Sequence, residues 1–128
     1  MSAAETAISV LIPPLQLVGD LNLPLNARGV VIFAHGSGSS RLSPRNQHVA
    51  RALGKASLAT LLFDLLTEGE AQDRSNVFDI DLLGRRLIYA IDWMLLQPHL
   101  AHLPIGLFGA STGAAAALKA AALRPEAI

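Results

Sequence analysis

A serine flanked by glycines lies near the end of the sequence, in Gly109-Ala110-Ser111-Thr112-Gly113. This is the pattern G-x-S-x-G, in which a nucleophilic serine stands on a sharp turn between a strand and a helix. The apolar run 105–108 precedes the pattern and an alanine-rich run follows it, as such a strand and helix would. In this arrangement Ser111 has a strained backbone, and Gly109 and Gly113 lack the bulk that would hold strand and helix apart. The pattern therefore predicts that the Ser111 hydroxyl attacks a carbonyl carbon.

A second segment, His35-Gly36-Ser37-Gly38, closes the apolar run 29–35 and opens a loop rich in glycine and serine. Beside a serine nucleophile of this kind, two backbone N–H groups bind the negatively charged oxygen of the tetrahedral intermediate. One belongs to the residue after the nucleophile, and the other comes from a loop in this position. We therefore expect the N–H groups of Thr112 and Ser37 to form an oxyanion hole. Loss of one such donor typically lowers the rate by about 10²–10³.

The elements that must position these residues follow from the apolar pattern. Continuous or alternating apolar runs predict strands at 8–12, 15–23, 29–35, 58–66 and 104–108. Ser43 followed by Pro44 is a typical helix start, and apolar spacing predicts two more helices at 78–97 and 112–123. Strands that alternate with helices predict an α/β fold, a three-layer sandwich around a mostly parallel sheet.

One polar segment between these elements, and the polar face of one predicted helix, are expected to face solvent. The segment 67–76 is polar and acidic, and we interpret it as a loop. The face of helix 78–97 that lies opposite its apolar stripe carries Arg85, Arg86, Tyr89 and Asp92.

Length and composition exclude several classes of protein. The chain has 128 residues, which predicts one domain over 1–128 with no internal boundary. Its 10 basic and 10 acidic residues cancel, so a nucleic-acid partner is not expected. It has no cysteine, which excludes disulfides, thiolate catalysis and cysteine-based zinc sites. We expect no metal site.

No membrane partner is expected either. The stretch 93–118 carries no charged residue, but Pro98, Pro104 and several glycines interrupt it, so we interpret it as buried strand, turn and helix. The first basic residue is Arg28, so the start of the chain lacks the positive region of a secretory signal. These observations predict a cytoplasmic protein.

Three segments together, 29–45, 60–66 and 108–113, resemble the α/β-hydrolase superfamily, and more narrowly its dienelactone-hydrolase-like branch. The run Val-Val-Ile-Phe-Ala-His-Gly-Ser-Gly-Ser-Ser-Arg, followed by Ser-Pro-Arg-Asn, is more distinctive than the serine pattern itself. The resemblance covers the N-terminal portion of the family's domain. It implies that the first five strands lie in the order 1-2-4-3-5, and that the reaction is hydrolysis of a carboxylic ester or lactone without a metal or organic cofactor. Some relatives look to be fused to a phosphoribosyltransferase domain, which implies a further partner.

The resemblance also exposes a departure from the family pattern. In this fold the triad runs in the order serine, acid, histidine. After Ser111 the sequence holds 17 residues with no histidine, and Glu126 is the only acidic residue among them. The triad acid and base are thus absent, as if the domain were truncated after helix 112–123. An alternative interpretation is a catalytically inactive hydrolase-fold protein that serves as a binding or oligomerising module.

Several upstream residues are candidate contacts to a small-molecule substrate. They are His35, Gly36, Gly38, Arg41, Arg45 and Asp64. The two arginines could bind a carboxylate or phosphate, although surface charge beside a helix start is the simpler interpretation. His35 is more simply a structural residue that bonds the loop backbone, and Asp64 lies at the edge of the site.

The truncation has a structural consequence. In the family order, strand 104–108 would pair with a further strand, and here that apolar edge would be bare. Helix 112–123 would also leave an apolar patch. We therefore expect self-association, or docking of a missing C-terminal half, through this edge.

A remote alternative is dinucleotide binding. Residues 36–41 read G-x-G-x-x-R between a predicted strand and helix, which lacks the third glycine of the dinucleotide fingerprint.

Overall fold

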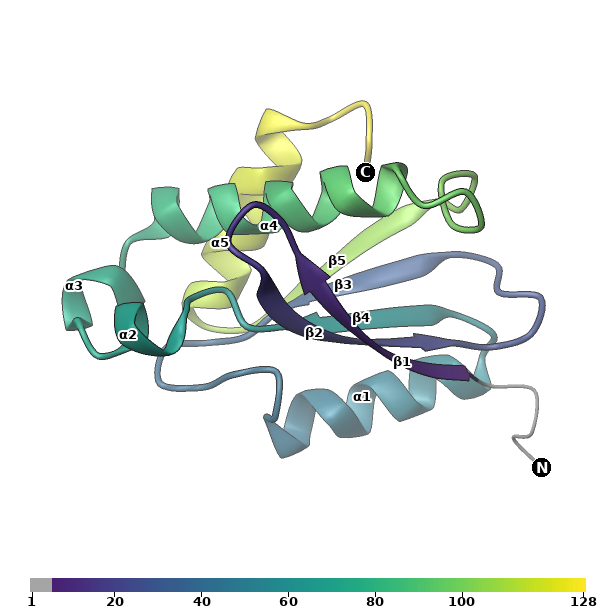
Figure 1. Cartoon of the computed structure of the whole chain (residues 1–128), viewed down its shortest axis with the longest axis horizontal. Coiled ribbons are helices and arrows are strands. Elements are labelled where there is room, and N and C mark those ends of the chain that lie inside the picture. Colours follow the sequence, from purple (N-terminus) through teal and green to yellow (C-terminus); the bar gives the residue numbers. More distant parts are fainter. Residues whose placement is uncertain (1–5) are drawn as a thin grey trace.

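A five-stranded sheet forms the centre of the computed structural model, which describes residues 6–128 (Figure 1). The strands are β1 (Thr6–Ile12), β2 (Leu17–Leu23), β3 (Val30–Ala34), β4 (Ala59–Phe63) and β5 (Ile105–Gly109). They lie in the order β1-β2-β4-β3-β5, which confirms the predicted order. Strand β3 is parallel to β4 and to β5, while β2 is antiparallel to β1 and β4. Four strands thus share one direction and only β2 is reversed.

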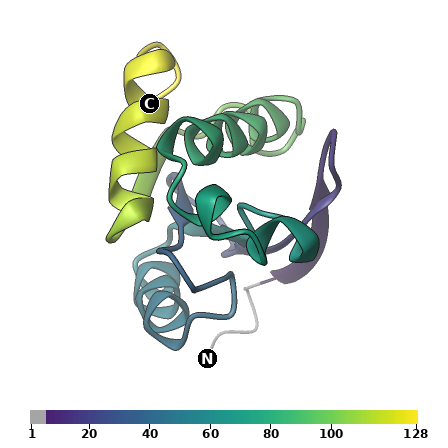
Figure 2. The same cartoon turned by 90° about the vertical axis from the view of Figure 1, so that its left-hand side faces the viewer.

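Helices cover both faces of this sheet and complete the predicted three layers (Figures 1 and 2). Helix α1 (Pro44–Lys55) packs on one face, where Phe33, Ala50 and Leu62 form a small core. Helices α4 (Ile80–Leu95) and α5 (Thr112–Leu123) cover the other face. None of the helices in residues 6–128 has both the length and the apolar content that crossing a lipid bilayer requires.

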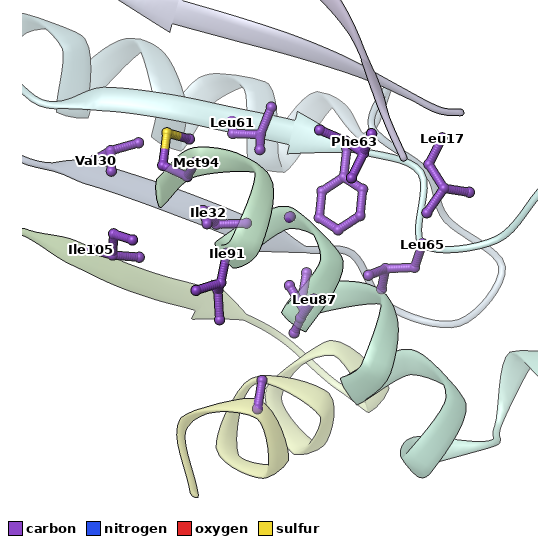
Figure 3. Close-up of a cluster of buried hydrophobic side chains, with 14 of the residues drawn as sticks. Leu17, Val30, Ile32, Leu61, Phe63, Leu65, Leu87, Ile91, Met94 and Ile105 are labelled. Atoms are coloured by element: carbon purple, nitrogen blue, oxygen red, sulfur yellow. The ribbon is translucent and has the colours of Figure 1, made fainter. Parts of the chain in front are cut away.

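The larger core lies between the sheet and helix α4 (Figure 3). Ile32 of β3 and Leu61 of β4 meet Leu87, Ile91 and Met94 of α4 there, all fully buried. All five residues of β4 are buried, as expected for a strand covered on both faces. This packing holds β3, β4 and β5 as a rigid base for the loops at their carboxyl ends.

Most predicted boundaries agree with the structure to within a few residues. The Ser43 side chain caps α1 by accepting from the N–H of Asn46, and Pro44 is the first residue of the helix. Helix α5 begins and ends as predicted. The predicted strand 15–23 begins at Leu17, because residues 13–16 form the turn between β1 and β2.

The interpretation of 67–76 as a loop was wrong. Two short helices, α2 (Glu68–Ala71) and α3 (Arg74–Val77), lie there. Thr67 and Asp73 cap them, and Thr67 forms a reciprocal capping box with Glu70.

The expectation that Arg86 faces solvent was also wrong. Arg86 is only 6% exposed, and its guanidinium hydrogen-bonds both carboxylate oxygens of Glu70 at 2.7 Å. The physical reason is that the capped helix α2 brings Glu70 over this face of α4 and supplies a carboxylate partner for the buried charge.

Candidate active site

Ser111 stands on the turn between β5 and α5 with φ 59° and ψ −130°. A non-glycine residue with positive φ and extended ψ is strained, and such strain concentrates at functional sites. Ser111 is the N-cap residue of α5, yet its side chain makes no capping hydrogen bond. The residue is exposed, and it lies at the positive end of a 12-residue helix.

The two glycines of the pattern permit this turn because each meets backbone atoms closely. A β-carbon at Gly109 would overlap the carbonyl group of Gly113 and lie 2.8 Å from the amide nitrogen of Ala114. A β-carbon at Gly113 would overlap the carbonyl of Ala34 and lie 2.8 Å from the carbonyl oxygen of His35. Any side chain at either position would therefore force β5, α5 and the end of β3 apart.

The loop after β3 lies directly against this turn. Strands β3 and β5 pair in parallel with Ala34 opposite Gly109, so their carboxyl ends are neighbours. A β-carbon at Gly36 would lie 3.3 Å from the carbonyl oxygen of Ala110 and 3.4 Å from Cβ of Ser111. The structure thus brings together the two segments that the sequence singled out, including Ser37 and Thr112.

Two cavities flank the turn. The first, here called the loop cavity, has a volume of about 240 Å³ and contains both Ser37 and Thr112 in its wall. Its other lining residues are His35, Gly36, Gly38, Ser39, Ser40, Asp64, Leu66, Ala71, Val77 and Leu83. The second, here called the helix cavity, has a volume of about 310 Å³ and lies between Ser111 and the start of α1. It is lined by Gly36, Ser39, Ser43, Pro44, Arg45, Asn46, Ala110 and Ser111.

His35 uses both of its ring nitrogens in contacts to the backbone. Nδ1 lies 3.0 Å from the carbonyl oxygen of Gly36, and Nε2 accepts from the N–H of Leu65 at 3.0 Å. Burial lowers the pKa of this imidazole, and its neighbours Gly36 and Asp64 oppose that shift only in part. A neutral ring that donates from Nδ1 and accepts at Nε2 satisfies both contacts, so no nitrogen is left to activate Ser111.

The two candidate arginines differ in their partners. Arg41 is held by Asp64, which accepts from its Nη1 and from its backbone N–H, each at 2.8 Å. Its Nε also lies 3.4 Å from a carboxylate oxygen of Asp20. Arg45 is exposed, lines the helix cavity with Ser111, and has no acidic partner within 4 Å among residues 6–128. Of the two, only Arg45 has a guanidinium available to a ligand.

The remaining histidines lie elsewhere. His99 and His102 line a separate cavity with residues 23–27, at the amino end of β5. His48 is exposed on α1 and lines neither cavity beside Ser111. Within the part of the chain that the structure describes, no group of three or more potential ligand side chains could hold a metal ion.

Comparison with known proteins gives this arrangement a context. No known family profile matches the sequence. A dienelactone hydrolase from Anabaena variabilis superposes on 99% of the chain with a TM-score of 0.90 and 52% identity. The chain has a dienelactone-hydrolase-like α/β-hydrolase fold. Two further α/β structures share this fold at low identity: a dienelactone-hydrolase-like promiscuous phosphotriesterase from metagenomic libraries (20%, TM-score 0.73) and Est1E from Butyrivibrio proteoclasticus (18%, TM-score 0.76).

The chain corresponds to part of these relatives. It spans 61% of the Anabaena hydrolase chain. Two Mycobacterium tuberculosis proteins, from strains CDC 1551 / Oshkosh and H37Rv, are 56% identical over 118 residues, which is 92% of this chain and 27% of theirs. Both are provisionally named as phosphoribosyl transferases.

The apolar wall of the loop cavity was not predicted from the sequence. It consists of Leu66, Ala71, Val77 and Leu83, of which Ala71 and Val77 belong to the misinterpreted segment and to its edge. Arg86 and Glu70 support this wall, because Arg86 also donates to the carbonyl oxygen of Leu65 at 3.2 Å. The capping residues Thr67 and Asp73 were the available signal for these helices of the hydrolase fold.

Proposed function

We propose that Ser111 is the nucleophile of a hydrolase that cleaves a carboxylic ester or a lactone. The observation that carries this proposal is the strained backbone of Ser111, which leaves its hydroxyl free at the start of α5 beside the loop of Gly36. The N–H groups of Ser37 and Thr112, on the two sides of this junction, are the proposed oxyanion hole.

The proposed reaction has two steps. The Ser111 oxygen bonds to the carbonyl carbon, its proton passes to a general base, and the carbonyl oxygen becomes an oxyanion. Collapse of this intermediate breaks the ester bond, and the leaving alkoxide takes the proton from the base. Water then attacks the acyl-serine in the same way and releases the acid. The positive end of α5 favours the negative charge in both steps.

The general base must come from outside the described residues. His35 is engaged at both nitrogens, and neither cavity beside Ser111 is lined by another histidine of residues 6–128. The chain matches 61% of the Anabaena hydrolase. We therefore propose that a histidine and its acidic partner lie in sequence beyond the 128 residues, in the order that this fold requires.

A second candidate function concerns residues 6–128 by themselves. We propose that they form a non-catalytic module to which another polypeptide binds. Strand β5 ends the sheet order, and Leu118 and Leu123 of α5 are 73% and 53% exposed. The proposed occupant of this edge is the remaining half of the domain or a second copy. A phosphoribosyl transferase domain is a further proposed partner, since the mycobacterial relatives bear that name. Light scattering of residues 1–128 tests this candidate, and a sharp monomer peak with cooperative melting would contradict it.

The catalytic proposal is tested on the protein at its full natural length. We expect turnover of p-nitrophenyl acetate, which Ser111→Ala should abolish and Ser9→Ala on the exposed strand β1 should leave intact. A fluorophosphonate probe should label the wild type and Ser9→Ala but not Ser111→Ala. Equal turnover in the wild type and Ser111→Ala would refute the proposal.

A further inference from the structure

The loop cavity has an unusual balance of charge for a site beside two candidate oxyanion donors. Among residues 6–128, Asp64 is the one charged side chain that lines it, and no lysine or arginine of this part of the chain does so. The rest of the wall is apolar or carries uncharged groups: glycine backbone, the hydroxyls of serines and of Thr112, and the neutral ring of His35. A group that enters this cavity therefore meets methyl groups, neutral hydrogen-bonding groups and one carboxylate.

Arg41 pairs with Asp64 of the cavity wall, and its charge is already compensated. Asp64 accepts from its Nη1 and from its backbone N–H, each at 2.8 Å, and Asp20 lies 3.4 Å from its Nε. Two carboxylates thus share one guanidinium. Arg41 does not line the loop cavity, so an anionic ligand there would meet the Asp64 carboxylate first.

We propose that the Arg41–Asp64 pair determines substrate class, so that the loop cavity takes a neutral, apolar acyl group and rejects an acyl group that ends in a carboxylate. This inference rests on the proposed function, because it assigns the loop cavity to the acyl side of an ester attacked by Ser111. The apolar wall of the loop cavity, which includes Leu66 and Leu83, binds the hydrocarbon chain, and Asp64 repels a terminal carboxylate.

The proposal predicts that selectivity can be shifted in both directions. Asp64→Asn removes the repelling charge and frees the Arg41 guanidinium beside the cavity, so anionic acyl groups should become acceptable. Arg41→Gln leaves the Asp64 carboxylate unpaired, so this variant should reject anionic acyl groups more strongly than the wild type does. Asp20→Asn is the matched control, because Asp20 also contacts Arg41 but does not line the loop cavity.

Two esters of equal acyl length test this, p-nitrophenyl valerate and mono-p-nitrophenyl glutarate, with the protein at its full natural length and neutral pH. We expect wild-type kcat/KM to favour valerate by at least about tenfold, because a desolvated or repelled charge is strongly discriminated against. Asp64→Asn should lower that ratio at least about tenfold, and Asp20→Asn should change it less than about twofold. A wild-type preference for glutarate, or equal ratios in the wild type and Asp64→Asn, would overturn the proposal.

Binding without hydrolysis separates this proposal from the one on Ser111. Valeramide and glutaramate carry the same two acyl chains and can be titrated by NMR against Ser111→Ala. If valeramide binds more tightly and Asp64→Asn in the same background reverses the order, the specificity inference stands, even where no ester is hydrolysed. If ester turnover is normal but the two amides bind equally, the nucleophile assignment stands and the specificity inference fails.

Discussion

Nε2 of His35 accepts the backbone N–H of Leu65 at 3.0 Å, so an imidazole at the end of β3 holds the chain that leaves β4. The same ring contacts the carbonyl oxygen of Gly36 through Nδ1. This histidine thereby connects the loop of Gly36 to the segment that carries the wall of the loop cavity. Protonation of Nε2 would break the first of these contacts.

Acid should therefore weaken the fold through His35. Burial lowers its pKa in the folded chain below the ordinary value of 6.5, so below that pH the unfolded state binds more protons than the folded state. The stabilisation is fully present above pH 6.5 and is lost as the pH falls toward the folded pKa. Urea unfolding at a series of pH values should show this decline.

His35→Gln provides the comparison for that measurement. The variant should be less stable at neutral pH, yet the slope of its unfolding free energy with pH just below 6.5 should be flatter than in the wild type. Identical slopes in the two proteins would show that His35 does not titrate differently in the folded and unfolded states. His48→Gln, at an exposed position of α1, is the control for replacing a histidine by glutamine.

Gly113→Ala should severely disrupt the turn between β5 and α5. Its β-carbon would overlap the carbonyl of Ala34, and rigid backbone cannot yield as a flexible side chain can. We expect a loss of at least about 3 kcal/mol in the free energy of unfolding, measured by chemical denaturation. Gly69→Ala is the control: a β-carbon there meets no atom of residues 6–128 within 4 Å, so this helical substitution should be neutral or stabilising by up to about 1 kcal/mol. Similar losses in both variants would contradict the steric explanation.

Ser37→Pro tests the proposed oxyanion donor. Proline lacks the backbone N–H, so kcat of the protein at its full natural length should fall by about 10²–10³ while KM changes less. Ser37→Ala retains the N–H and should keep kcat within a few-fold of the wild type. Melting temperatures of both variants show whether the fold is intact. A fully active, folded Ser37→Pro would exclude this donor.

The Glu70–Arg86 pair should contribute to stability down to low pH. Arg86 hydrogen bonds lower the pKa of Glu70 from 4.5 to about 2, so its contribution is present above pH 4.5 and is lost as the pH falls through 2. Glu70→Gln should cost about 1–3 kcal/mol at neutral pH, because it leaves a buried guanidinium without its charge partner. Asp81→Asn, which breaks the exposed pair with Lys119, should cost less than about 1 kcal/mol. Equal costs would mean that burial of Arg86 does not matter.

The sequence was most informative where local chemistry and the apolar pattern agree. Ser43-Pro44 marks the start of α1, and the continuous apolar run of β4 indicates a strand covered on both faces. The strand order followed from the family resemblance rather than from periodicity. The backbone strain at Ser111 was foreseeable because G-x-S-x-G leaves few conformations for the residue between strand and helix.

Residues whose environment is set by distant segments could not be predicted. Arg86 lies on the polar face of α4 by spacing alone, and its burial depends on Glu70, 16 residues away. Likewise, nothing local distinguishes Arg41 from Arg45; the difference arises because β4 brings Asp64 to within 2.8 Å of Arg41. Long-range pairing of this kind is a property of the packed chain.

Strand β5 is the last in the sheet order and ends two residues before Ser111. Any polypeptide that adds a parallel strand to β5 would therefore bring its own carboxyl-terminal loop beside the serine. Strand addition and the proposed reaction at Ser111 would then depend on the same sheet edge. A substitution that blocks strand addition would also stop that reaction, although Ser111 itself is unchanged.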